Sequence, residues 1–237
     1  MRKIYPAFII FLILVSVYFF FNIYSPGSPA KIDFSKVNLT AKPASEFVYK
    51  ENLELKLNGE QITARDVDKQ YERIPPESRG NVTKDQVLEA IVDQKLLLQE
   101  ADKNKIAATD EEVNKYLGQV RTSSGLDENA LNKEISKSGY TIDEYKNNIK
   151  EMLTESKLLN QELDLKNAQA SEADVNNFIQ KNKDEFQDVF SEGNNTDIES
   201  LVKNRVKQKL TREKQQALVK NYIESLRQKA NIKGGGV

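Results

Sequence analysis

Most of the side chains that carry enzyme chemistry are missing from this sequence. Its 237 residues include no His, no Cys and no Trp. A Cys nucleophile, a Ser-His-Asp triad and a zinc site of His and Cys ligands all need residues that the chain lacks. Carboxylate, Lys or Tyr chemistry remains, or no chemistry at all.

The acidic clusters do not form a ligand pattern. Asp110–Glu112 and Asp143–Glu144 each fall at the start of a predicted helix, where negative charge stabilises the helix dipole. The sequence contains neither an Asp-x-Asp-x-Asp-Gly loop nor a Gly-x-x-x-x-Gly-Lys-Ser/Thr loop. We therefore predict no metal site, no cofactor and no catalytic residue.

The charge of the chain argues against nucleic acid as a partner. There are 35 Lys and Arg residues against 36 Asp and Glu residues, and the formal net charge is -1. A basic run between Lys203 and Lys214 also contains Glu213, which is typical of a solvated helix face. Binding to phosphates needs a clustered basic excess.

Three Asn-x-Ser/Thr tripeptides are candidate glycosylation sites, at Asn38, Asn81 and Asn194. Such tripeptides also arise by chance in an Asn-rich chain. These tripeptides therefore have two interpretations, as glycosylation sites or as chance occurrences.

The N-terminus has the pattern of a membrane segment. Arg2 and Lys3 precede an apolar run over residues 4–24, and a helix over its last 18 residues spans roughly 27 Å, just under one bilayer core. An aromatic cluster ends the run where an interfacial belt would lie, which favours an uncleaved single-pass anchor with the rest of the chain extracytoplasmic. The alternative is a signal peptide, because Ser28-Pro29-Ala30 has the small residues that a signal peptidase needs, and the protein would then be secreted or periplasmic.

Five segments after the anchor carry the start signal of a capped helix. In each, a Thr or Ser precedes Asp, Glu or Gln by three residues, so that each side chain can pair with the backbone N–H of the other residue. The pairs are Thr63 with Asp66, Thr83 with Gln86, Thr109 with Glu112, Thr141 with Glu144, and Ser171 with Asp174. Apolar residues at spacings of three and four follow each start, which predicts five helices. Pro75-Pro76 ends the first, and Gly125 and Gly139 bracket a shorter additional helix.

Two further patterns complete the predicted fold. Leu53–Leu57 alternates and runs into Asn58-Gly59, which predicts a short strand entering a turn. A long amphipathic helix over about 197–230 precedes residues 231–233, which can return as a second strand beside the first. The predicted fold class is mainly α: a helical cradle with a long C-terminal helix and a minor short β pairing, preceded by one N-terminal transmembrane helix.

These motifs, read in order, resemble the SurA/PrsA type of extracytoplasmic chaperone, whose peptide-binding module is also similar to the C-terminal region of trigger factor. The resemblance covers residues 53–233. It rests on Leu57-Asn-Gly-Glu-Gln-Ile-Thr-Ala-Arg-Asp66, on the helix Val87–Ala101, on Ile106–Val113, on Gly139–Tyr145 and on Tyr222–Lys233. It implies a SurA-N-like helical chaperone domain over 53–233. The residue patterns outside this range predict a transmembrane anchor or signal segment over 1–24, a linker over 25–52 and a flexible tail over 234–237.

One departure from the family pattern bears on activity. Many relatives carry a parvulin-type prolyl isomerase domain between the helix that ends near Phe186 and the final helix. Here that interval is about ten residues, from Gln187 to Thr196, which is far below domain size. The resemblance therefore implies a holding activity for unfolded or nascent exported polypeptides, without an isomerase activity.

The resemblance also implies an apolar cleft in which such clients bind. We place six residues near it, because they lie on helices around the predicted concave side, with core packing as the alternative for each. They are Tyr71, Ile74, Tyr116, Val120, Tyr145 and Met152.

Two classes of function remain open on the sequence. The leading one is a membrane-anchored, non-enzymatic holdase chaperone, and the other is an interaction module for one dedicated partner, such as a separate isomerase or a translocation component. The sequence does not decide whether two copies form a homodimer.

Overall fold

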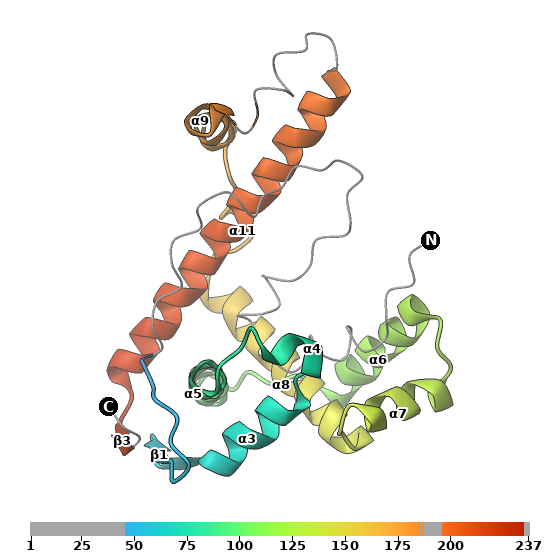
Figure 1. Cartoon of the computed structure of the whole chain (residues 1–237), viewed down its shortest axis with the longest axis vertical. Coiled ribbons are helices and arrows are strands. Elements are labelled where there is room, and N and C mark those ends of the chain that lie inside the picture. Colours follow the sequence, from blue (N-terminus) through green and yellow to red (C-terminus); the bar gives the residue numbers. More distant parts are fainter. Residues whose placement is uncertain (1–45, 185, 187–195, 235–237) are drawn as a thin grey trace. The chain divides into compact units, whose positions relative to one another are not determined.

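The computed structural model describes residues 46–184, 186 and 196–234 (Figure 1). The predicted membrane segment and most of the predicted linker lie outside these residues. Among the helices that are described, none combines the length and the apolar character needed to cross a bilayer. The described part is mainly helical with one small sheet, as predicted.

The chain divides into two compact units, a division that the sequence had not indicated. Unit 1 comprises the chain up to Leu158 together with Leu226–Val237, and unit 2 comprises Leu159–Ser225. Two helices, α8 (Ile142–Glu162) and α11 (Thr196–Lys229), contribute residues to both units. The end of α11 therefore belongs to the same unit as residues 46–158.

The sheet of unit 1 joins distant parts of the sequence. β1 (Glu54–Leu57) lies between β2 (Glu60–Thr63) and β3 (Ile232–Gly234), and both pairings are antiparallel. The turn between β1 and β2 places Asn58 at φ 52° and Gly59 at φ 93°, as a two-residue hairpin requires. The predicted pairing of the C-terminal strand with the first strand is confirmed, with Leu57 opposite Ile232.

All five predicted capped starts are confirmed. They begin α3 (Ala64–Arg73), α5 (Lys84–Lys103), α6 (Asp110–Ser124), α8 and α9 (Glu172–Lys181). At α5, for example, Thr83 Oγ1 accepts from the Gln86 N–H at 3.3 Å, and Gln86 Oε1 accepts from the Thr83 N–H at 3.2 Å. The predicted short helix is α7 (Glu128–Lys137).

The structure adds two elements that the sequence did not predict. Strand β2 was not predicted because Glu60–Thr63 contains a single apolar residue, Ile62, so its sequence shows no alternation. The short helix α4 (Pro76–Arg79) begins at the proline pair that was expected only to end α3. Proline is favoured in the first turn of a helix because its missing N–H has no partner there in any case.

The apolar stripe of α11 is less covered than the sequence indicated. The apolar side of the predicted amphipathic helix includes Leu201 and Leu218, but these side chains are 55% and 37% exposed, whereas the neighbouring Val202 and Val219 are buried. Adjacent residues on an α-helix point about 100° apart, so that only one of each pair can face the same packing partner.

Candidate functional site

Helices α6, α7 and α8 of unit 1 enclose an apolar cluster that is buried at its centre and partly open at its margin. Its centre contains Val113, Val120, Leu131, Ile135, Tyr140, Tyr145 and Ile149. Its margin, here called the α6–α8 rim, contains the partly buried residues Tyr116, Leu117, Leu126, Ile142, Met152 and Leu153. The rim is therefore the part of this cluster that offers apolar side-chain surface to another molecule.

The structure places the six predicted client-binding residues in three different settings. Ile74, Val120 and Tyr145 are buried, so that little of their side-chain surface can meet a client in this conformation. Tyr116 and Met152 belong to the α6–α8 rim. Client binding itself stays a prediction for all six.

Tyr71, the remaining predicted residue, lies beside a polar group at the start of α5. The Lys84 ammonium is 5.9 Å from the centre of the Tyr71 ring and 4.5 Å from that of the Tyr49 ring, and its Nζ lies 2.6 Å from Asp68 Oδ1. The hydroxyl of Tyr49 donates to the same carboxylate oxygen at 2.8 Å. Tyr71 is thus half-buried against a cation that the chain itself supplies.

Arg73 and Lys69 of α3 hold the start of α8. Both side chains bond Oε1 of Glu144, at 3.0 Å from Arg73 and 2.8 Å from Lys69, and the Arg73 guanidinium also lies 3.8 Å from the centre of the Tyr140 ring. The other Glu144 oxygen accepts from the Thr141 N–H at 3.0 Å. These bonds from Lys69, Thr141 and Arg73 lower the pKa of Glu144 to about 2. The contact ties the helix that carries Tyr71 to the α6–α8 cluster.

The pKa of Glu144 predicts a contribution to acid lability. The folded-state pKa of about 2 lies below the ordinary value of 4.5. The stability that Glu144 contributes is therefore fully present above about pH 4.5 and is lost as the pH falls toward 2. We expect Glu144→Gln to unfold more readily than the wild type at pH 7, and the difference between their urea midpoints to shrink between pH 4.5 and pH 2. A difference that stays constant over this range would show that the carboxylate charge is unimportant.

Polar contacts also fix α8 against the segment that leads into α6. The hydroxyl of Thr154, which is buried, accepts from the Ala108 N–H at 2.9 Å. Lys157 Nζ donates to the Ala107 carbonyl at 3.0 Å and to Glu112 Oε2 at 2.6 Å. These contacts set the position of α6 relative to α8, and hence the spacing of the rim residues.

Tyr145 places a hydroxyl inside the apolar cluster. Its side chain is 1% exposed, burial raises the pKa of its hydroxyl, and the hydroxyl has no hydrogen-bond partner among the described residues. An unpaired buried hydroxyl costs about 1–3 kcal/mol.

We therefore expect Tyr145→Phe to leave the free energy of unfolding unchanged or to raise it by up to about 1–3 kcal/mol, measured by urea denaturation. Tyr49→Phe is the matched control, because it removes a hydroxyl that donates to Asp68, and we expect it to lower stability. A large loss of stability in Tyr145→Phe would mean that this hydroxyl has a partner.

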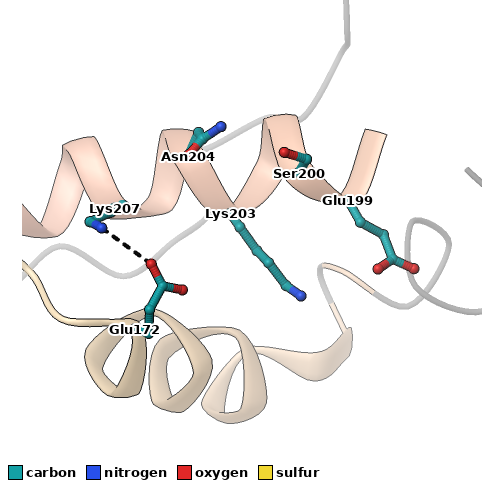
Figure 2. A pocket seen from close by; sticks show the side chains of 6 residues that line it. All are labelled: Glu172, Glu199, Ser200, Lys203, Asn204 and Lys207. Atoms are coloured by element: carbon teal, nitrogen blue, oxygen red, sulfur yellow. Dashed lines mark hydrogen bonds and ion pairs between the residues drawn. The ribbon is translucent and has the colours of Figure 1, made fainter. Parts of the chain in front are cut away.

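Unit 2 presents polar and apolar surface separately. A hollow of about 330 Å³ lies between α9 and α11, and Figure 2 shows Lys203 reaching from α11 across it toward α9. Its lining residues are Glu172, Glu199, Ser200, Lys203, Asn204 and Lys207, and Lys207 pairs with Glu172 at 3.2 Å. All six lining residues are polar or charged, and the large apolar side chains that are exposed among the described residues of this unit are Leu201 and Leu218.

The structure describes one of the three predicted glycosylation sites and both acidic clusters. Asn81 is exposed in the turn before α5, while Asn38 and Asn194 lie outside the described residues. Asp110 and Glu112 pair with Lys150 and Lys157. In the part of the chain that the structure describes, no group of three acidic side chains is arranged to hold a metal ion.

Residues 1–159 match the family described as the SurA-like N-terminal domain, and the chain therefore belongs to that family. It is 31% identical to Chaperone SurA of Nitrosococcus oceani over 110 residues, which are 46% of this chain and 25% of that protein. The match thus spans a quarter of the length of this curated relative.

A solved structure has the same fold. The structure was described together with the virulence factor PEB4 and the periplasmic protein Cj1289, which are two structurally related SurA-like chaperones of Campylobacter jejuni. The similarity covers 78% of this chain and 100% of that chain, with a TM-score of 0.54 and 15% sequence identity. At 15% sequence identity this similarity shows a shared fold.

Proposed function

We propose that this chain is a membrane-anchored, extracytoplasmic holdase chaperone that binds unfolded or newly exported polypeptides and catalyses no reaction. The observation that carries the proposal is the α6–α8 rim, a set of partly buried apolar residues in a chain of the SurA-like family. Anchoring through residues 4–24 rests on their apolar run and on the basic residues that precede it.

The α6–α8 rim can bind clients whose sequences are unrelated to one another. An unfolded polypeptide exposes apolar side chains, and burying them against Tyr116, Leu117, Met152 and Leu153 returns about 25 cal/mol per Å² without a sequence code. Met and aromatic side chains adapt to differently shaped partners. Because the rim residues are only partly exposed, each contact is small, and we expect weak binding that allows release.

The same reasoning extends to unit 2. Leu201 and Leu218 are exposed on α11 beside polar and charged neighbours, so that each offers an isolated apolar contact. The interval between Phe186 and α11 has no room for an isomerase domain, which supports a holding function without isomerase activity.

A light-scattering assay tests the holdase proposal. The full chain, kept in a mild detergent, is mixed without ATP with a reference protein diluted from denaturant, and detergent alone is the blank. We expect a stoichiometric excess of the chain to suppress aggregation of the reference protein. Unchanged scattering would refute the holdase proposal.

Two variants and a matched control locate the binding surface. We expect Met152→Ser and Leu201→Ser each to weaken suppression by several-fold, because each removes about 1 kcal/mol of apolar contact. Ser200→Ala, beside Leu201 on the same helix, is the control and should suppress as the wild type does. Circular dichroism shows whether each variant remains folded.

Capture from membranes distinguishes the chaperone from the dedicated interaction module. Many clients, each below stoichiometry, favour a chaperone. One stoichiometric folded partner favours the adaptor. Two copies per complex would favour the homodimer that the sequence leaves open.

A further inference from the structure

The last two turns of α6 consist largely of residues that form helices poorly. We call residues 118–125, which are these turns and the glycine that follows them, the α6 lid. Five of its eight residues are Gly, Thr or Ser. All three residue types have lower helix propensities than Ala, Leu, Lys or Glu. The α6 lid therefore gains little helix stability from its own sequence.

Hydroxyl groups within the lid bond the carbonyls of its own helix. Thr122 Oγ1 donates to the Gly118 carbonyl at 3.0 Å, and Ser123 Oγ donates to the Val120 carbonyl at 3.1 Å. Such bonds compete for carbonyls that belong to the helical ladder, which slightly destabilises a helix and often bends it. They lower the stability of the lid further.

Gly118 is not required by close packing. Nothing lies within 4 Å of the position that an alanine methyl group would take there. A glycine inside a helix reduces the population of the helical state by about two- to fivefold relative to alanine. Gly125, at the other end of the lid, adopts φ 68°. The lid is thus bounded by two glycines, at which the backbone turns most easily.

The first turn of α6 is held by stronger contacts than the lid. Its start carries the capping box of Thr109, and Glu112 pairs with Lys157 of α8 at 2.6 Å. The lid pairs with α7 through Arg121 and Glu128, whose Nη1 and Oε2 atoms are 3.4 Å apart. These two side chains are 46% and 75% exposed, so water screens the pair and it contributes little.

Val120 is the buried residue of the lid. Its side chain is 6% exposed and lies in the centre of the apolar cluster, and the rim residues Leu117 and Leu126 flank the lid in the sequence. Figure 1 shows the loop that joins α6 to α7 at the outer edge of this group of helices. Opening of the lid lifts Val120 out of the cluster and enlarges the apolar surface of the α6–α8 rim, while the first turn of α6 stays in place.

We propose that the α6 lid opens by local unfolding and so admits an apolar segment of an unfolded client polypeptide to the centre of the cluster. The role as a gate for clients rests on the proposed holdase function, whereas the opening itself is a property of unit 1. Because the client binds the open form, its apparent affinity is reduced by the fraction of molecules that are open. A change in that fraction therefore changes client binding by the same factor.

A thiol probe tests the opening, because the chain has no cysteine of its own. Val120→Cys and Val113→Cys each place one buried thiol in the same cluster and on the same helix, inside and outside the lid. A colorimetric disulfide reagent reaches a buried thiol when the structure around it opens. We expect the full chain with Val120→Cys to react at least about tenfold faster than the chain with Val113→Cys. Equal rates would overturn the proposal.

Hydrogen exchange of the wild-type chain keeps the test valid even if a cysteine variant fails to fold. We expect the backbone amides of residues 119–124 to exchange faster than those of residues 114–117 in the same helix. Fast exchange that is confined to residues 122–124 is ordinary fraying of a helix end. That result would also overturn the proposal, because Val120 would then stay in the cluster.

Gly118→Ala tests the connection to clients. The added methyl group meets open space and favours the helix, so in the Val120→Cys background we expect the thiol to react about two- to fivefold more slowly. The concentration of chain that gives half-suppression of aggregation should rise by the same factor. Gly80→Ala also meets open space but lies before α5, and as the control it should change neither quantity.

The two measurements distinguish a failure of the gate from a failure of the holdase function. A slower thiol reaction in Gly118→Ala with unchanged suppression would overturn the gate. A wild type that suppresses no aggregation would refute the holdase function and the gate with it, while the thiol rates would still decide whether the lid opens.

Discussion

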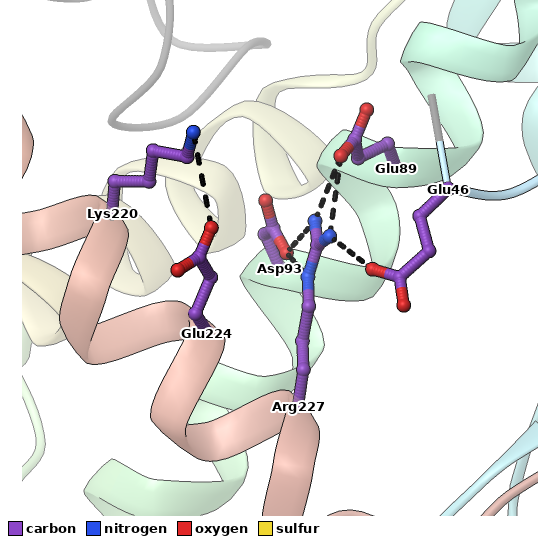
Figure 3. A network of polar contacts seen from close by, with 6 residues as sticks. All are labelled: Glu46, Glu89, Asp93, Lys220, Glu224 and Arg227. Atoms are coloured by element: carbon purple, nitrogen blue, oxygen red, sulfur yellow. Dashed lines mark hydrogen bonds and ion pairs between the residues drawn. The ribbon is translucent and has the colours of Figure 1, made fainter. Parts of the chain in front are cut away.

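Replacing Arg227 by Met is expected to lower the free energy of unfolding at neutral pH by about 3–5 kcal/mol, which is the usual cost of removing one partner from a buried ion pair. Arg227, near the end of α11, bonds Glu89 and Asp93 of α5 (Figure 3), and the side chains of Arg227 and Asp93 are only 13% and 17% exposed. Met keeps the apolar stem of the side chain but leaves Asp93 and Glu89 facing one another without a cation. Urea denaturation followed by circular dichroism at pH 7 measures the loss. The loss should be smaller at pH 5, because burial raises the pKa of Asp93 to about 6 and a protonated Asp93 needs no cation.

An ion pair on the same helix is the matched control for Arg227. Lys220 pairs with Glu224 (Figure 3), with Nζ 3.8 Å from Oε1, and both side chains are more than half exposed. Lys220→Met should therefore change the unfolding free energy by less than about 0.5 kcal/mol. If Lys220→Met and Arg227→Met cost the same, burial does not explain the importance of Arg227.

A double variant separates the loss of a charge pair from the exposure of a lone charge. Replacing both Arg227 by Met and Asp93 by Leu removes the buried cation together with its closest carboxylate. We expect this variant to be more stable than Arg227→Met alone, because apolar replacement of a whole buried pair is often neutral. A further loss of stability would contradict this account.

Gly234→Ala is expected to release β3 from β1 and to lower the free energy of unfolding by about 2–4 kcal/mol. Gly234 has φ +76°, and a Cβ at this position would lie 2.3 Å from the carbonyl oxygen of Glu54. A backbone atom of the paired strand cannot move away without breaking the pairing. Hydrogen exchange of β1 amides and urea denaturation measure the two effects.

Two other glycines provide controls for Gly234. Gly59 also has a positive φ, of +93°, but nothing lies within 4 Å of a Cβ there, so Gly59→Ala pays only the backbone cost of about 1–2 kcal/mol. Gly80 has φ -62° and open space, and its replacement by Ala should be nearly neutral. If Gly234→Ala and Gly59→Ala have equal effects, the close approach of β3 to β1 is not the cause.

The helix starts were predictable from sequence because their determinants are local. Thr63 and Asp66, and the four similar pairs, lie three residues apart, and both partners of each cap belong to the same turn. The Asn58-Gly59 turn is local in the same way, because the two residues that adopt positive φ adjoin in sequence. A single sequence therefore contains all the residues that determine each of these caps and this turn.

The candidate site was only partly predictable. Helical periodicity identified apolar residues on α6 and α8, but it could not tell the buried Val120 and Tyr145 from the partly buried Tyr116 and Met152. That difference depends on how far α7 and neighbouring segments cover each helix face. The exposure of Leu201 could have been suspected, because Leu201 and Val202 are adjacent and cannot face one packing partner.

By itself, the sequence determined where the helices begin, where the hairpin turns and which end of the chain returns to the sheet. Only the tertiary structure decided that Arg227 meets Asp93, 134 residues earlier, and Glu46, 181 residues earlier. The physical reason is that caps and turns are fixed by bonds within a few residues. Burial, and the charges that it forces together, depends on contacts between segments whose spacing in the sequence carries no signal.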